Sequence, residues 1–166
     1  APATPETYTR PLRDALPISD VRSLAQVAHD GGAGLARERH LSSWLALNAL
    51  AFADHPEQGG WTRADLDARL AEDWFDPATL WVLERRDEVS GADDGAAAAS
   101  VWVKQVPGES AEIYVLASHP DLAGRGLGRR LLDHALGEIA RAGASDVELY
   151  VDGGNAAARR LYERAG

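Results

Sequence analysis

The spacing of apolar residues separates a helical N-terminal half from a C-terminal half in which strands and helices alternate. Residues 1–19 are rich in Pro and Thr and show no apolar period, so we interpret them as a tail or linker remnant and place one domain at 20–166. Within that domain, apolar residues recur every three or four positions, which is typical of helices packed on a core. The segments of the first half with this pattern are 20–32, 41–54 and 62–75.

Farther along the chain, two apolar runs at 79–87 and 97–106 flank the Gly- and Asp-rich segment 88–96, which predicts an antiparallel hairpin. A strand, a glycine-rich turn, a helix, a second strand and a second helix follow. The two strands are predicted at 111–118 and 146–152, and the two helices at 128–143 and 155–166. A strand–helix–strand connection joins parallel neighbours, so we predict an α/β fold with a mixed sheet flanked by helices.

The strand predicted at 111–118 carries polar and apolar residues in alternation. Side chains of successive strand residues point to opposite faces of a sheet. We therefore expect Ile113 and Val115 on one face, and Glu112 and Tyr114 on the other.

The composition narrows the classes of partner. At 166 residues, 45% of them hydrophobic, the chain is long enough to bury one core. It carries 17 Lys and Arg against 26 Asp and Glu, a formal net charge of -9. We predict no nucleic-acid partner, because binding a phosphate backbone needs a broad basic face. No apolar run approaches the roughly 18 residues of a membrane span, so no membrane association is predicted.

The chain contains no cysteine, which excludes disulfides, thiolate metal sites and a cysteine nucleophile. This composition is compatible with a reducing cytoplasm, the location that we predict. The five histidines show no metal-ligand spacing, and we predict no metal site.

The segment GRGLGRR, residues 124–130, is the first candidate for ligand binding. Glycines before a helix let a ligand reach the backbone, and the N–H groups of the first helical turn point at an anion. With Arg125, Arg129 and Arg130 adding positive charge at its rim, the segment predicts a phosphate or pyrophosphate cradle. It is not a P-loop, because no Gly-Lys-Ser/Thr follows, and Arg129 stands where a dinucleotide fingerprint needs glycine. A tight turn without a ligand is the alternative that the loop alone leaves open.

Two motifs of this region resemble, in the same order, the signatures of the GNAT acyltransferase superfamily. HPDLAGRGLGRRLL, residues 119–132, resembles its acetyl-CoA pyrophosphate loop, whose pattern is Q/R-x-x-G-x-G/A. NAAARRLYERAG, residues 155–166, resembles its second signature, a helix that begins with Asn and has Tyr near its end. Asn155 is also a predicted helix N-cap. Ala123 stands where the superfamily has Gln or Arg, which implies that one side-chain contact is lost while the backbone contacts remain.

A longer segment, WLALNALAFADHPEQGGWTRADLDARLAEDWFDP at 44–77, resembles the C-terminal, active half of the mycothiol synthases, and the similarity covers 42–166. That family has two tandem GNAT domains and uses acetyl-CoA to acetylate the cysteine amine of cysteinyl-glucosaminyl-inositol. The resemblance implies an N-acetyltransferase with the GNAT fold, lacking the last C-terminal strands. It also implies a small-molecule amine acceptor and an N-terminal sister GNAT domain in the full-length protein.

The resemblance assigns roles to individual residues. Glu112 would be the general base that takes a proton from the attacking amine, and Tyr162 the general acid at the departing thiolate. The residues implied to bind acetyl-CoA are Leu116, Ala117, Ser118, Ala123, Gly124, Arg125, Gly126, Leu127, Gly128, Arg129, Asn155, Ala156, Ala157, Ala158, Arg159 and Arg160. The residues implied to line the acceptor pocket are Glu57, Lys104 and Tyr150.

Two other functions stay open at this point. One is a GNAT acetyltransferase for a different amine, such as a peptide N-terminus, and the other is a domain that binds acyl-CoA without turnover. At the level of residues, Glu112 has the alternative of an ordinary solvated strand carboxylate. Tyr162 has that of a core tyrosine with its hydroxyl at the rim, and Lys104 that of a surface lysine.

Overall fold

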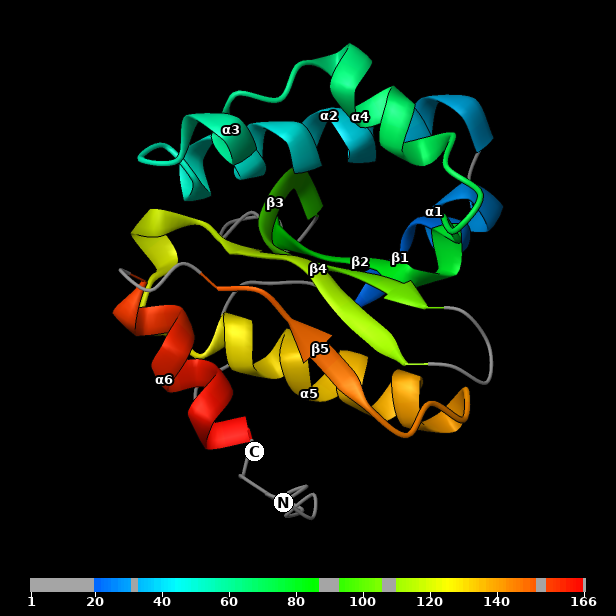
Figure 1. The fold of residues 1–166 in the computed structure, drawn as a ribbon. Coiled ribbons are helices and arrows are strands. Elements are labelled where there is room, and N and C mark those ends of the chain that lie inside the picture. The colour runs from blue at the N-terminus through cyan, green and yellow to red at the C-terminus, as the bar shows by residue number, and fades with distance from the viewer. Residues whose placement is uncertain (1–19, 31–32, 87–92, 106–109, 152–154, 166) are drawn as a thin grey trace.

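A five-stranded sheet in the order β1-β2-β3-β4-β5 lies between two layers of helices (Figure 1). The structure is a computed structural model and describes residues 20–30, 33–86, 93–105, 110–151 and 155–165. The strands are β1 (Arg22–Ser23), β2 (Leu80–Arg86), β3 (Asp93–Gln105), β4 (Ala111–Ser118) and β5 (Val147–Leu149). Neighbouring strands from β1 to β4 are antiparallel, whereas β4 and β5 are parallel. The predicted hairpin and the predicted mixed sheet are both confirmed.

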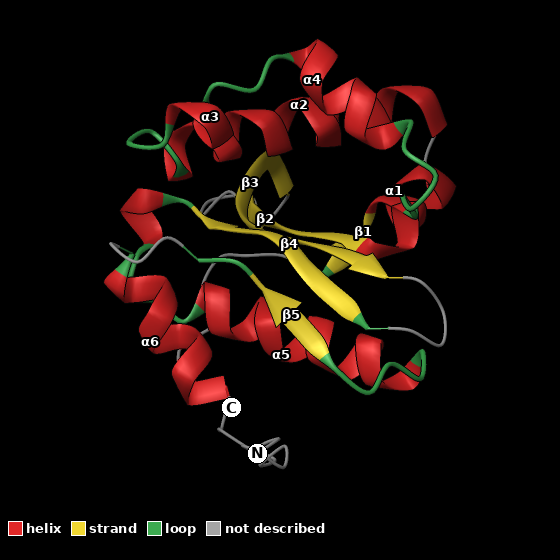
Figure 2. Ribbon diagram, in the orientation of Figure 1, coloured by secondary structure: helices red, strands yellow, loops and turns green. Residues whose placement is uncertain are grey.

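Helices cover both faces of this sheet, with α1 to α4 on one side and α5 and α6 on the other (Figure 2). The helices of the first layer are α1 (Leu24–Asp30), α2 (Ala33–Ala51), α3 (Pro56–Gly59) and α4 (Arg63–Leu70). Those of the second layer are α5 (Leu127–Arg141) and α6 (Ala156–Ala165), and short 3-10 turns occupy Pro77–Thr79 and Pro120–Leu122. None of these described helices combines the length and the apolar character needed to cross a membrane.

Each face of the sheet packs on its helices through a separate apolar cluster. On the α5 face, Leu131 and Ile139 are buried against strand residues that include Val103. On the α2 face, Trp44 and Trp102 are fully buried and meet edge to face, with ring centroids 5.5 Å apart. The sheet is therefore covered on both sides, and its strands supply apolar side chains in both directions.

A β-bulge in β4 overturns the strict alternation expected for that strand. Trp102 of β3 pairs with Val115, but the next residue, Val103, pairs with Ile113, so that Tyr114 is an extra residue without a partner on β3. A bulge of this kind shifts the following side chains to the opposite face. Ile113 consequently packs in the α5-side cluster and Val115 in the α2-side cluster, and the prediction that both lie on one face is wrong.

Several element boundaries differ from the predicted ones. Helix α2 begins at Ala33 rather than at 41, because residues such as Leu35, which is 87% exposed, face solvent and create no apolar period. β3 begins at Asp93, inside the predicted turn, and the residues 88–92 of that turn lie outside the described part of the chain. β5 ends at Leu149, before the predicted end at 152.

Candidate functional site

The pairing between β4 and β5 is short, which leaves the second half of one β4 edge without a strand beside it. Pairing runs from Ala111 opposite Val147 to Ile113 opposite Leu149. β4 then continues to Ser118, whereas the two residues after Leu149 belong to no strand. Among the described residues, the backbone groups along this edge of 114–118 therefore have no ladder partner and are available to a ligand. Leu116, Ala117 and Ser118, predicted to contact the cofactor, lie on this stretch.

The glycine loop follows β4 directly and connects it to α5. One short-range hydrogen bond shapes its start, where the N–H of Asp121 donates to the Nδ1 atom of His119 at 3.2 Å. Gly124 and Gly126 adopt the left-handed region, with φ of 77° and 78°, where side chains with a Cβ are strained. A Cβ built on either glycine would meet nothing within 4 Å. The outer side of the loop is thus open, and a ligand can approach the backbone closely.

The N-terminus of α5 presents unpaired N–H groups beside this open loop. Gly126 is the N-cap and has no side chain to accept a bond from the first turn. The N–H of Arg130 donates to the Gly126 carbonyl at 3.0 Å. In the described structure the N–H groups of Leu127, Gly128 and Arg129 have no acceptor, as expected for a helix start. Together with the helix dipole they form a cradle that fits the predicted pyrophosphate.

The cradle, β4 and α6 meet at Gly128. A Cβ on this residue would lie 3.3 Å from Cδ2 of Leu161 in α6 and 3.5 Å from the Ser118 hydroxyl at the end of β4. A side chain there would push these elements apart. The absence of a side chain at Gly128 therefore lets the start of α5, the end of β4 and α6 pack closely together.

The arginines around the cradle differ in how they are engaged. The Nε atom of Arg129 donates to both carboxylate oxygens of Asp133, at 2.7 and 2.9 Å, and its Nη1 donates to the Arg164 carbonyl at 3.0 Å. Arg159 lies 3.8 Å from Glu163 on the same helix. In the described part of the chain no ion pair engages Arg125, which is exposed on the loop and keeps its whole guanidinium for an anion.

Helix α6 carries the remaining cofactor-side residues. The Asn155 side chain accepts the N–H of Ala158 at 3.0 Å, which confirms the predicted N-cap. Ala156, Ala157 and Arg160 are exposed, so this helix start is accessible. Tyr162 packs against the α5-side cluster, and burial raises the pKa of its phenol above the ordinary value. Its hydroxyl therefore stays protonated at neutral pH.

Glu112 lies on the opposite face of the sheet, which is the α2 face. It stands directly across from Lys104 on β3 and from Glu148 on β5, and directly paired residues share a face. The Nζ atom of Lys104 lies 5.2 Å from the ring centroid of Trp74, which packs with the α2-side cluster. Lys104 is thus half-buried over an aromatic ring rather than free in solvent.

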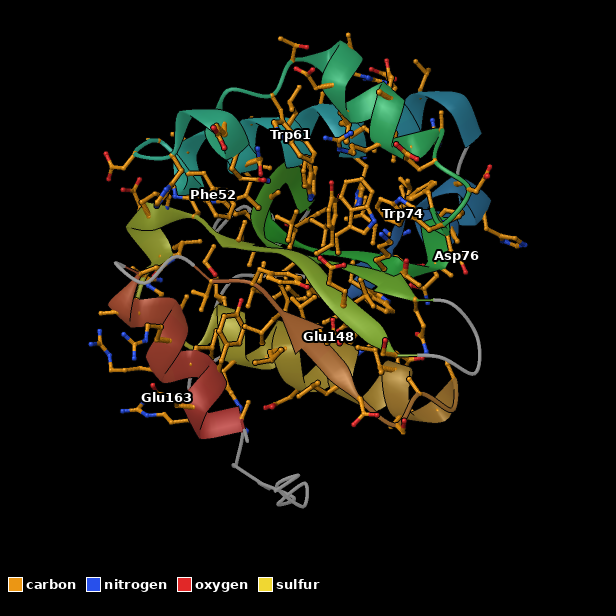
Figure 3. The ribbon with its side chains drawn as sticks, in the orientation of Figure 1. Phe52, Trp61, Trp74, Asp76, Glu148 and Glu163 are labelled. Atoms are coloured by element: carbon orange, nitrogen blue, oxygen red, sulfur yellow. The ribbon has the colours of Figure 1, made fainter. Side chains whose placement is uncertain are left out.

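Three aromatic side chains, Trp61, Trp74 and Tyr114, pack together on this face and form what we call the aromatic wall. The sequence patterns did not assign them a role. The rings of the wall come from the α2 layer and from the strands, and Figure 3 shows Trp61 and Trp74 between that layer and the sheet. The ring of Tyr114 lies 5.0 Å from Trp74 and 6.4 Å from Trp61, measured between centroids. Trp61 lies before α4, and Trp74 lies after α4 ends at Leu70, so the prediction of one helix over 62–75 is wrong at its end and helical periodicity gives Trp74 the wrong setting.

The other two residues predicted to line the acceptor pocket, Glu57 and Tyr150, lie outside the paired strands that carry Lys104 and Glu112. Glu57 is exposed on α3 and borders a surface depression with Trp61 and Arg69. Tyr150 follows β5 and is 80% exposed. The structure therefore brings Lys104 and Glu112 together and places Glu57 beside the aromatic wall. No hydrogen bond within the described ranges joins Glu112 to Glu57, Tyr150 or Tyr162.

Comparison with known proteins adds to this geometry. The family model of the acetyltransferase (GNAT) family matches residues 44–166. A mycothiol acetyltransferase from Beutenbergia cavernae is 50% identical over 133 residues, which are 80% of this chain and 42% of the relative. A mycothiol acetyltransferase from Clavibacter michiganensis is 53% identical over 122 residues, covering 74% of this chain and 37% of the relative. The chain thus spans about two fifths of the length of these curated relatives.

Solved structures share the fold. The crystal structure of the ribosomal-protein-S18-alanine N-acetyltransferase from Escherichia coli matches with a TM-score of 0.57 and 27% identity. The match covers 76% of this chain and 70% of that chain.

The left-handed cap of α5 predicts a difference between two glycines of the loop and helix. Gly126→Ala should lower the free energy of unfolding by about 1–2 kcal/mol, because a Cβ is strained at this backbone conformation. Gly137→Ala is the matched control inside α5, where a Cβ would come no closer than 3.9 Å to the Arg141 guanidinium. It should raise the free energy of unfolding by up to about 1 kcal/mol. Urea unfolding measures both, and equal effects would contradict the left-handed cap.

Proposed function

The chain belongs to the GNAT acetyltransferase family, and on this premise we propose that it transfers the acetyl group of acetyl-CoA to the amine of a small molecule, as a mycothiol synthase does. The junction at Gly128 carries the proposal. There the end of β4, with its open edge, and the first turn of α5, with its unpaired N–H groups, meet Leu161 of α6. A cofactor that carries both a thioester arm and a pyrophosphate would use the open edge and the N–H groups at once.

Acetyl-CoA supplies the activated acetyl thioester. The main chain of 116–118 would hold its pantetheine arm, and the cradle of 124–129 would hold its pyrophosphate with the Arg125 guanidinium at the rim. The first turn of α6, residues 155–160, would border the cofactor on the other side. Each of these groups contributes backbone polarity or positive charge, which complements an anionic ligand in an otherwise acidic chain.

Glu112 and Tyr162 would move the protons. An ammonium group cannot attack a thioester, so Glu112 takes its proton, directly or through water, and the nitrogen forms a bond to the acetyl carbon. The nitrogen would then carry one proton more than an amide does, and it would lose that proton to water. As the carbon–sulfur bond breaks, Tyr162 would give its phenolic proton to the sulfur, and a proton from water would restore the phenol. The raised pKa of Tyr162 keeps that proton available at neutral pH. The gap in pairing after Leu149 is what would let residues from the two faces of the sheet act on one reaction centre.

The acceptor would bind on the α2 face. We propose the cysteinyl-glucosaminyl-inositol that mycothiol synthases acetylate, since two curated relatives are named mycothiol acetyltransferases. Carboxylates at Glu57 and Glu112 suit its ammonium group, and Lys104, Tyr150 and the aromatic wall suit a polyhydroxylated sugar. Because the relatives are longer than this chain, we also propose a sister domain that completes the pocket, and a cytoplasmic location where acetyl-CoA is supplied.

A second acceptor class has support from one solved structure. The Escherichia coli neighbour, at 27% identity, is named an alanine N-acetyltransferase of a ribosomal protein. A panel of amines that contains both the cysteinyl sugar and peptides with free N-termini separates the two classes. Faster acetylation of the peptides would assign this chain to the second class.

Replacing Glu112 tests the general base. Glu112→Gln keeps the shape of the side chain but removes the proton acceptor, so kcat/KM should fall by about 100-fold or more. The affinity for acetyl-CoA, measured by titration, should stay within about twofold. Glu148→Gln removes an equal charge from the paired position on β5 and should lower the rate by less than about threefold. An unchanged rate in Glu112→Gln would remove this residue from the mechanism and favour a solvated strand carboxylate.

Replacing Tyr162 tests the general acid. Tyr162→Phe keeps the buried ring, so the free energy of unfolding should change by less than about 1 kcal/mol, while kcat falls by about 10-fold to 100-fold. Because burial raises the pKa of the phenol, kcat of the unsubstituted protein should decline only at a pH above the ordinary tyrosine pKa, and the variant should lose this alkaline limb. A full pH–rate profile measures both. A variant with normal kcat would make Tyr162 a packing residue only.

A further inference from the structure

The guanidinium of Arg129 links two helices that are otherwise joined by few polar contacts. Its Nη1 donates to the Arg164 carbonyl in the last turn of α6, at 3.0 Å. Its Nε is held by the Asp133 carboxylate one turn along α5, at 2.7 and 2.9 Å. From this geometry we propose that the Arg129 side chain is a positioning residue, which holds the C-terminal turn of α6, and with it Tyr162, against α5. The proposal rests on the proposed role of Tyr162.

The bond from Arg129 to Arg164 joins a charged donor to a main-chain carbonyl. A hydrogen bond whose donor is ionised is stronger than one between neutral groups. A single such bond can therefore hold a turn of α6 against α5. Asp133 fixes the direction of the guanidinium through a two-oxygen contact, so that Nη1 points across to α6.

This contact bears on Tyr162 because of where it lies along α6. Leu161 packs over Gly128 in the first turn of α5, where a Cβ would come within 3.3 Å of it. The Arg164 carbonyl is held three residues later, so Tyr162 lies between two attachment points. The other end of α6 is fixed independently by the Asn155 cap. Loss of the Arg129 contact should therefore loosen the turn that carries Tyr162 and leave the cofactor-side start of the helix in place.

The same geometry gives the main chain and the side chain of Arg129 different roles. The main-chain N–H of Arg129 is unpaired and stays directed at an anion, but two nitrogens of its side chain are already engaged. Arg125, exposed on the loop, carries the side-chain charge for a phosphate. The cofactor-binding role that the resemblance implies for Arg129 would thus fall to its main-chain N–H, while its side chain holds α6.

Three variants separate this role from a phosphate contact. Arg129→Met removes the donors and keeps the apolar stem. Asp133→Ala leaves the arginine in place but frees its guanidinium. If the guanidinium binds phosphate, the affinity for CoA should rise in this variant. If the guanidinium holds α6, that contact should weaken. Arg141→Ala is the control, since this arginine lies at the far end of α5, pairs with Glu138 and is assigned to no ligand. Each variant is examined by hydrogen exchange of the α6 amides, by titration with CoA, and by kcat and KM for acetyl-CoA.

If the proposal is right, amides of 161–165 exchange about tenfold faster in Arg129→Met and Asp133→Ala, and as before in Arg141→Ala. CoA affinity and KM should stay within about twofold in all three variants. kcat should fall by about fivefold to tenfold in the first two, because a loosened Tyr162 is misplaced for proton transfer.

Two results would overturn the proposal. In the first, α6 exchange is unchanged while Arg129→Met weakens CoA binding and Asp133→Ala strengthens it, which would make the guanidinium a phosphate ligand. In the second, α6 loosens but kcat does not change, which would sever the link to Tyr162. If the unsubstituted chain turns over no amine, the proposed function fails, and the exchange comparison still decides whether Arg129 holds α6.

Discussion

The separation of β4 from β5 after Leu149 is the constraint on which the rest of the site depends. Two parallel strands that stayed paired would satisfy each other's backbone groups and close the sheet between its two faces. Because the pairing stops, β4 keeps one open edge, and groups from the α2 face and the α5 face can approach the same place. The bulge at Tyr114 lies where the pairing ends, and it also turns the aromatic ring of Tyr114 toward the α2 layer.

The two faces of the sheet beside this opening differ in the chemical groups that they present to a ligand. The α5 side is electropositive at the backbone level, with left-handed glycines, unpaired N–H groups and the exposed Arg125. The α2 side carries carboxylates, a lysine and tryptophan rings. An anionic donor and a cationic, hydroxylated acceptor would therefore be attracted to different faces and meet only where the sheet opens. This separation would let a chain with a net charge of -9 hold the proposed pyrophosphate.

The order of strands and helices after residue 79, the hairpin, the parallel pair and the Asn155 cap all follow from local patterns, and the structure confirms them. The short strand β1 lies inside the helix predicted at 20–32, which is wrong there. The bulge also escaped prediction, because residues 113–116 are an unbroken apolar run and fit either register. The bond from Arg129 to the Arg164 carbonyl joins positions 35 apart, and sequence spacing does not indicate it. Motif resemblance proposes residues for cofactor binding, but only the packing shows that the side chain of one of them, Arg129, donates to a carbonyl of α6.

The most direct test of the account is a calorimetric titration of this chain with acetyl-CoA and with acetyl-pantetheine, which lacks the pyrophosphate and the nucleotide. The cradle at α5 predicts that acetyl-CoA binds at least about tenfold more tightly, because charge-assisted bonds to backbone N–H groups and Arg125 form only with the phosphates. Equal affinity for the two compounds, or no binding of either by a folded chain, would contradict the assignment of the glycine loop as a pyrophosphate site.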